Sequence, residues 1–228
     1  MTALVALIGS PVGQSLSPRM QNAAFAARGL DWVYLACEVA AGELEAAVRG
    51  LEALGFAGAN VTAPYKRDVA ELVETDLPSV NVLLFDPPRG FSTDATIVEG
   101  LKAERPAIIG DGGAAVAFRQ AWSEARVFSR RGDWPPDVAD CDFVVNATPV
   151  REEVLVDLTP GQTLVDLPYP DSATAAAARA AGARVFDGLE VLVAQGAASF
   201  ELWTGVPAPI EVMRRAVGLP HAEPDDSG

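Results

Sequence analysis

The chain has 228 residues, of which 50% are hydrophobic and 21% charged, a composition typical of a globular protein with a sizeable core. Its 17 basic residues against 31 acidic residues give a formal net charge of -14. Nucleic acids and most membrane surfaces are negatively charged, so this charge disfavours nonspecific binding to either. It does not exclude a local basic pocket that binds a small anion. The length predicts one large domain or two small ones.

Cysteine and histidine are scarce. Cys37 and Cys141 form no CxxC pair, which predicts reduced core thiols in a cytoplasmic protein. The only histidine, His221, lies in the polar segment HAEPDDSG, which disfavours a Ser-His-Asp triad, a Cys-His pair and a histidine-based metal site. Acid–base chemistry must then use Lys, Asp, Glu, Tyr or Cys. No signal peptide and no membrane-spanning segment is expected.

Short apolar runs alternate with amphipathic patterns in the first half of the chain. ALVALIG is an apolar run that ends at a glycine, as buried parallel strands do. Ser17 is expected to cap the following helix, with Pro18 in its first turn. The β-α-β-α-β order implies a mostly parallel sheet. The pattern predicts strands at 3–9, 32–39 and 56–62, and helices at 19–30, 40–55 and 66–74.

The pattern restarts near residue 100 and again predicts an α/β unit, this one followed by two helices. The expected elements are a strand, a glycine turn and a helix at 105–122, strands at 125–131, 142–150 and 163–169, a helix and a strand at 175–188, and helices at 188–205 and 207–219.

A glycine turn in this second unit is typical of nucleotide binding. In GDGGAA the glycines let the backbone approach a pyrophosphate, and the helix N-terminus supplies N–H donors. The next strand ends in a serine and two arginines, where arginine accommodates a 2′-phosphate, so NADP is favoured over NAD. The residues in question are Gly110, Gly112, Gly113, Ala114, Ser129, Arg130 and Arg131.

Two hydroxyl groups follow the first strand at its carboxyl end. Ser15 and Ser17 flank one apolar residue, so they can point the same way and bind a carboxylate. Because Ser17 is also a helix-capping candidate, Ser15 is the more diagnostic of the two.

Six motifs together resemble the shikimate dehydrogenase family over nearly the full length. They are IGSPVGQSLSP, NVTAPYK, STD, GDGGAA, NATPV and DGLEVLVAQGAASFELWTG. The resemblance implies an α/β substrate domain at 1–100, a Rossmann-like NADP-binding domain at 101–188, and C-terminal helices at 189–228 that return to the substrate domain. It also implies reduction of 3-dehydroshikimate to shikimate with NADPH, by a monomer or homodimer whose partner is its small-molecule substrate.

The same resemblance implies a role for each residue of the motifs. Lys66 and Asp94 match the catalytic pair: a ketone that accepts hydride develops alkoxide charge, which an ammonium group stabilises and protonates. The residues matched to the substrate site are Ser15, Ser17, Asn60, Thr62, Asn81 and Gln195. Asn146, Thr148 and Gly188 are assigned to the cofactor site beside the glycine turn and the arginines.

The chain departs from the family pattern at several positions. Gln14 stands where the family usually has His, Val82 where it has Thr, Ser92 where it has Asn, and Arg151 begins a segment that usually holds glycine and methionine. Only RGDWPPDVADC connects SRR to DFVVNATPV, which predicts a cofactor domain shortened on its adenosine side. Two alternatives stay open: an NAD-dependent quinate or shikimate dehydrogenase, and a shikimate-binding paralogue with weak or absent cofactor binding.

Overall fold

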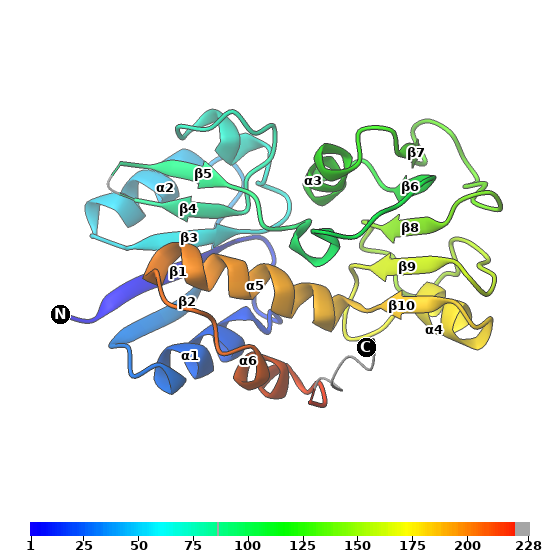
Figure 1. The fold of residues 1–228 in the computed structure, drawn as a ribbon. Coiled ribbons are helices and arrows are strands. Elements are labelled where there is room, and N and C mark those ends of the chain that lie inside the picture. Colours follow the sequence, from blue (N-terminus) through cyan, green and yellow to red (C-terminus); the bar gives the residue numbers. More distant parts are fainter. Residues whose placement is uncertain (86, 222–228) are drawn as a thin grey trace.

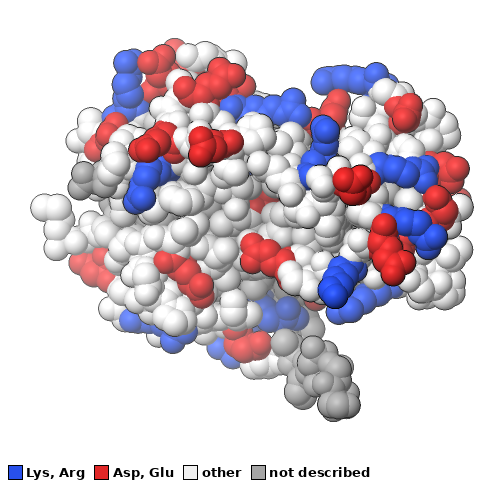
Figure 2. Space-filling view, turned by 45° about the horizontal axis from the view of Figure 1, so that its top comes forward, with Lys and Arg blue, Asp and Glu red and all other residues white. Residues whose placement is uncertain are grey.

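A computed structural model describes residues 1–85 and 87–221. Two five-stranded sheets lie side by side, each flanked by helices, and the chain passes from one to the other once before its C-terminal helices return (Figure 1). The predicted α/β class is confirmed. Basic and acidic side chains are interspersed over the face shown in Figure 2. No helix in the described part of the chain is long and apolar enough to cross a membrane.

The first sheet has the strand order β2-β1-β3-β4-β5. Its parallel part is formed by β1 (Ala3–Gly9), β2 (Trp32–Glu38) and β3 (Gly58–Val61). Two short antiparallel strands extend it, β4 (Val82–Leu84) and β5 (Arg89–Phe91). The sequence did not predict β4 and β5, because three residues are too few to show a periodic pattern.

Alternating residues of β1 face two different cores. Val5 and Leu7 pack with α1 (Ser17–Ala27) and the C-terminal helices, whereas Ala6 and Ile8 pack with α2 (Leu44–Ala53). A strand covered on both faces must be apolar throughout, which explains the run ALVALIG. Helix α2 turns one face to its core through Leu44, Val48 and Leu51, which follow the helical repeat.

The predicted helix at 66–74 is wrong. This segment forms only a 3₁₀ turn at Asp68–Glu71. Val69 is its single buried residue, so a longer helix would have little apolar surface to bury. The carbonyl of Lys66 instead accepts the Val80 N–H at 2.8 Å, which ties the chain before β4 to the segment that carries Lys66.

The second sheet is parallel throughout, in the order β10-β9-β8-β6-β7. Because β6 lies between β7 and β8, the two connections diverge beside its carboxyl end, the position where open α/β sheets bind ligands. Residues 129–142 contain no helix or strand, as the short connection predicts. The elements are β6 (Pro106–Ile109), α3 (Gly113–Ala121), β7 (Arg126–Phe128), β8 (Phe143–Asn146), β9 (Thr163–Asp166), α4 (Ala173–Ala180) and β10 (Arg184–Phe186).

The last two helices return to the first sheet. Helix α5 (Gly188–Thr204) begins beside β10 with a capping box between Asp187 and Glu190, then runs back across the first sheet (Figure 1). Its Phe200 stacks on Phe25 of α1 with ring centroids 5.3 Å apart. Helix α6 (Ile210–Val217) packs against α1 and α5. Residues 222–228 of the predicted C-terminal segment lie outside the described residues.

Candidate active site

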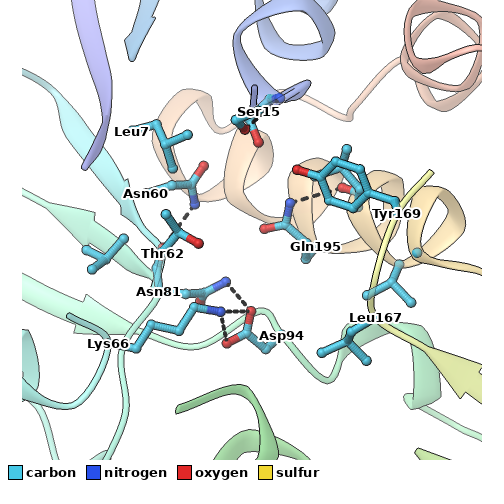
Figure 3. A pocket seen from close by; sticks show the side chains of 15 residues that line it. Leu7, Ser15, Asn60, Thr62, Lys66, Asn81, Asp94, Leu167, Tyr169 and Gln195 are labelled. Carbon is cyan, nitrogen blue, oxygen red and sulfur yellow. Dashed lines mark hydrogen bonds and ion pairs between the residues drawn. The ribbon is translucent and has the colours of Figure 1, made fainter. Parts of the chain in front are cut away.

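A cavity of about 190 Å³ lies between the two sheets, at the carboxyl ends of their strands. Its walls come from β1 and β3, the start of α1, the loops after β3, β5 and β9, the residue before β4, and the first turns of α5 (Figure 3). We call it the central cavity. All eight residues predicted for catalysis and substrate binding line it, although they come from distant parts of the chain: Ser15, Ser17, Asn60, Thr62, Lys66, Asn81, Asp94 and Gln195.

Lys66 and Asp94 form an ion pair at one end of the central cavity (Figure 3). Nζ of Lys66 lies 2.7 Å from both carboxylate oxygens of Asp94, and the two side chains are only 15% and 10% exposed. Asn81 orients the carboxylate, since its Nδ2 donates to Oδ1 of Asp94 at 3.0 Å. Its Oδ1 accepts the N–H of Thr93 at 2.7 Å, which fixes the loop that carries Asp94. The pair is thus held in one geometry.

Asn60 belongs to a buried hydrogen-bond network. Its Nδ2 donates to the carbonyl of Asn81 at 3.0 Å and to Oγ of Ser199 at 3.1 Å, so the protein uses both amide hydrogens. The hydroxyl of Tyr34 donates to Oδ1 at 2.8 Å. Burial raises the pKa of Tyr34 far above its usual value, which keeps the phenol protonated as a donor. Asn60 therefore has one lone pair left for a ligand.

Ser199 is a site residue that the sequence reasoning missed. It lies on α5 with no exposed surface, donates to the carbonyl of Gln195 at 2.8 Å, and lies 3.2 Å from Oγ1 of Thr93. Through Thr93, Ser199 connects Asn60 to Asn81, whose Nδ2 also donates to Thr93 Oγ1 at 3.0 Å. A buried serine inside an otherwise apolar helix was the available signal, because such a hydroxyl needs a partner.

Ser15 and Ser17 meet the cavity at the start of α1. The predicted cap at Ser17 is wrong: the helix begins at Ser17 itself, with Leu16 as N-cap and no side-chain cap hydrogen bond. Ser17 instead donates its N–H to Oγ of Ser15 at 3.2 Å, so Ser15 satisfies one free donor of the helix. Both hydroxyl groups stay in the cavity wall, near the positive end of the α1 dipole.

Gln195 and Tyr169 face the cavity from the opposite wall (Figure 3). Nε2 of Gln195 donates to the carbonyl of Leu192 at 3.0 Å, which leaves its amide oxygen toward the cavity. Tyr169 was not predicted as a site residue, although it ends the predicted strand TLVDLPY and so stands at the ligand-binding end of the sheet. The apolar lining residues were missed as well, and they are Leu7, Val61, Leu167, Val191 and Leu192.

The glycine turn between β6 and α3 lies against the segment that carries Lys66. Gly110 has φ +120°, a conformation that favours glycine, and a Cβ on Gly113 would come within 2.7 Å of Cβ of Lys66. Ser79 donates to the carbonyl of Gly113 at 3.0 Å, and Arg67 donates to the carbonyl of Asp111 at 2.5 Å. The glycine turn therefore packs directly against the chain segment that holds Lys66 of the ion pair.

The N-terminus of α3 carries free backbone donors. Gly112 is the N-cap and offers no side chain, and the first intrahelical bond runs from Val116 to Gly112. The N–H groups of Gly113 and Ala114 thus have no partner inside the helix, as an anion site at a helix N-terminus requires. Gly112 has open space where a Cβ would stand.

The two predicted arginines line a separate cavity of about 200 Å³, which we call the arginine cavity. Gly110, Ser129 and Thr148 line it too. Arg130 pairs with Glu153 at 2.5 Å and lies over the ring of Trp134, 5.2 Å from its centroid. Arg131 lies 3.6 Å from Asp111. The carboxylate of Asp111 therefore points to Arg131.

Asn146 is completely buried, so it does not face a ligand directly. Its Nδ2 donates to Asp166 at 2.7 Å, and its Oδ1 accepts both the N–H and the hydroxyl of Thr148. Asn146 thereby fixes Thr148 in the wall of the arginine cavity. Burial raises the pKa of Asp166. Gly188 lines the central cavity at the start of α5.

Comparisons with known proteins agree with this arrangement. The family model described as the shikimate dehydrogenase substrate binding domain matches residues 7–80, and that of the shikimate 5'-dehydrogenase C-terminal domain matches residues 188–217. A protein of Anaeromyxobacter dehalogenans named shikimate dehydrogenase (NADP(+)) is 40% identical, over 95% of this chain and 96% of its own length. The chain belongs to the shikimate dehydrogenase family.

Solved shikimate dehydrogenases share the whole fold. The Aquifex aeolicus enzyme superposes with a TM-score of 0.84 at 29% identity, covering 95% of this chain and 98% of that one. The Thermus thermophilus enzyme, in complex with NADP(H) and shikimate, gives a TM-score of 0.81 at 28% identity, covering 94% and 98%. The Rossmann-like second half predicted from the sequence is thus confirmed.

The shikimate dehydrogenase relatives are longer than this chain. The alignment with the Anaeromyxobacter protein extends over 266 positions, whereas this chain has 228 residues. The connection at 129–142, where the resemblance implies the shortening, has no helix or strand and borders the arginine cavity. Among the described residues, no group of histidine, cysteine, aspartate and glutamate could hold a metal ion.

Proposed function

We propose that this protein is an NADP-dependent shikimate dehydrogenase, which reversibly reduces 3-dehydroshikimate to shikimate with NADPH. The single observation that carries the proposal is the buried Lys66–Asp94 pair, which faces a cavity lined by hydroxyl and amide groups. Membership of the shikimate dehydrogenase family, shown by relatives named for NADP, supports the cofactor and the substrate.

The residues present fit NADP. The free N–H groups of Gly113 and Ala114 would hold the pyrophosphate, and the open space at Gly112 admits it. Arg130, Arg131 and Ser129 would hold the 2′-phosphate in the arginine cavity, where its charge competes with Glu153 and Asp111 for the two guanidinium groups. Thr148 and Gly188 would complete the cofactor wall. NADPH, when bound, supplies a hydride to the substrate carbon.

Lys66 would stabilise and protonate the substrate oxygen. A carbonyl that accepts a hydride becomes an alkoxide, and an ammonium group aimed at that oxygen stabilises the charge and transfers a proton from Nζ. Asp94 holds Nζ in place through both oxygens, and Asn81 holds Asp94. In the reverse direction, the same Nζ would accept the proton of the substrate hydroxyl.

The remaining polar groups would orient the substrate. Ser15 and Ser17, near the positive end of the α1 dipole, suit a carboxylate, whereas Thr62 and Gln195 suit hydroxyl groups. Asn60 and Asn81 would act chiefly by positioning, because their amide hydrogens are engaged within the protein. We assign 1–100 to the substrate, 101–188 to the cofactor and 189–228 to the returning helices, in a cytoplasmic monomer or homodimer.

The test is NADP reduction followed at 340 nm with shikimate and quinate in parallel, repeated with NAD. The proposal predicts the highest kcat/KM for shikimate with NADP. A preference for quinate or for NAD would favour a quinate or NAD-dependent enzyme of the same family. No reduction of either cofactor, together with measurable shikimate binding, would favour a binding paralogue.

A further inference from the structure

A second, wider cavity of about 730 Å³ adjoins the central cavity, and we call it the outer cavity. Ser15, Thr62 and Tyr169 line both, so the two cavities share a wall. Gln14, Glu38 and Arg151 also line the outer cavity, so a ligand held there would lie close to both Arg151 and Ser15.

Arg151 is held in place but keeps most of its donors free. Its backbone carbonyl accepts the N–H of Ala173 at 2.7 Å, and its Nε donates to the carbonyl of Asp171 at 3.2 Å. Within residues 1–85 and 87–221, no carboxylate lies within ion-pair distance of its guanidinium group. The other four N–H donors of the fork remain for a ligand.

The other charges in these walls are compensated or have the opposite sign. Lys66 is neutralised by Asp94, and Glu38 is an exposed carboxylate that accepts a hydrogen bond from Ser10 at 3.2 Å. Gln14 is neutral. In the described walls of the two cavities, Arg151 is therefore the only basic side chain without a carboxylate partner. A protein with a net charge of -14 otherwise repels an anionic ligand.

We propose that Arg151 recognises the carboxylate of the substrate at the mouth of the central cavity and sets the preference of this enzyme for acids over uncharged polyols. The proposal rests on the function proposed above. Ser15 and Ser17 offer the carboxylate neutral hydrogen bonds deeper inside, and Arg151 adds the full positive charge that they lack.

The test compares Arg151→Gln, Arg151→Lys and the control Arg49→Gln, with shikimate and with its methyl ester at saturating NADP, and also measures the KM for NADP at saturating shikimate. Arg49 lies on α2, with a side chain 71% exposed, and lines neither cavity. Arg151→Gln should lower kcat/KM for shikimate by about fivefold, which is the effect expected from losing one partly screened charge pair. It should change kcat/KM for the methyl ester by less than about twofold. Arg151→Lys should stay within about twofold of wild type, and added salt should narrow the wild-type preference for the acid.

Three results would overturn the inference. Equal losses for acid and ester would mean that Arg151 supports the loop, a rise only in the KM for NADP would place it in the cofactor site, and no change would remove it from recognition. The wild-type rate with shikimate tests the proposed function separately. Calorimetric titration of wild type and Arg151→Gln with the acid and the ester, in the presence of NADP, makes the same comparison without requiring turnover.

Discussion

The two halves of the molecule hold their functional charges in opposite ways. In the substrate half, Lys66 and Asp94 are nearly buried and fixed by a network that reaches from β2 to α5. In the cofactor half, the side chains of Arg130 and Arg131 are 60% and 87% exposed and pair with carboxylates at the surface. Buried pairs are costly to break, whereas exposed pairs contribute little. The charges of the substrate half are therefore preorganised, whereas those of the cofactor half are held only by weak surface pairs that an anionic ligand can replace.

The largest expected effect comes from Lys66→Met, which removes the ammonium group but keeps a side-chain stem against Gly113. We expect kcat to fall by about 10²- to 10⁴-fold with little change in the affinity for shikimate, because the charge is needed most as the alkoxide forms. Steady-state rates and calorimetry measure the two quantities. Lys102→Ala, at the only other lysine of the chain, should leave both unchanged. A Lys66→Met enzyme with near-normal kcat would remove Lys66 from the mechanism.

Arg130→Ala probes the cofactor half and should affect binding alone. We expect NADPH affinity to fall by about tenfold, the low end of the range for a charge-assisted hydrogen bond, since the site is exposed. NADH affinity and kcat should hardly change. Glu153→Gln is the matched variant: it frees Arg130 and should tighten NADPH binding. Fluorescence titration measures the affinity for each cofactor. Equal losses of affinity for NADPH and NADH would show that Arg130 stabilises the fold instead.

Ser199→Ala tests whether the substrate half owes its order to the buried network. Removing the hydroxyl leaves Asn60 Nδ2 and Thr93 Oγ1 each without one partner, which should cost about 1–3 kcal/mol in the free energy of unfolding. We also expect a several-fold loss in kcat/KM for shikimate with an unchanged KM for NADP. Urea unfolding and steady-state rates measure these, with exposed Ser123→Ala as control. A loss of stability without any loss of kcat/KM would make Ser199 purely structural.

The smallest expected effect is a change in the pH dependence of stability, caused by Asp166, which contacts Asn146 behind the arginine cavity. Burial raises the pKa of its carboxyl group above the usual 3.8, so the folded state binds a proton that the unfolded state has released. The free energy of unfolding contributed by Asp166 is therefore complete below 3.8 and is lost as the pH rises through the folded-state pKa. Asp166→Asn should remove this part of the pH dependence. Urea unfolding at several pH values between about 4 and 7 measures it. An unchanged slope would show that Asp166 does not contribute.

The sequence predicted most of the central cavity because its polar residues stand in short contiguous motifs that resemble those of the shikimate dehydrogenase family. The fold explains why these motifs meet: Ser15, Thr62 and Lys66 follow β1 and β3, neighbouring parallel strands whose carboxyl ends lie at one edge of the sheet. The partners of Ser199 and Tyr34 could not be predicted, because they lie on other elements. The packing of α5 across the first sheet brings Ser199 to Asn60, and the order of strands in that sheet brings Tyr34 to Asn60.

Local patterns failed where tertiary contacts override them. KRDVAELVE has helical periodicity, yet the carbonyl of Lys66 bonds to Val80 and the segment forms a single 3₁₀ turn. Strands β4 and β5 exist because β3 offers an edge to pair with, which no property of three residues reveals. The small number of residues between SRR and DFVVNATPV was enough to predict a short connection at 129–142. It could not predict that Arg130 and Arg131 pair with Glu153 and Asp111.

Calorimetric titration of the wild-type protein with shikimate and with NADP, separately and then together, tests the central claim most directly. The claim is that a complete substrate half is joined to a cofactor half that is shortened but still binds NADP. We predict that both ligands bind, and that Arg130→Ala weakens NADP binding while leaving shikimate binding unchanged. Binding of shikimate without any binding of NADP would contradict the account.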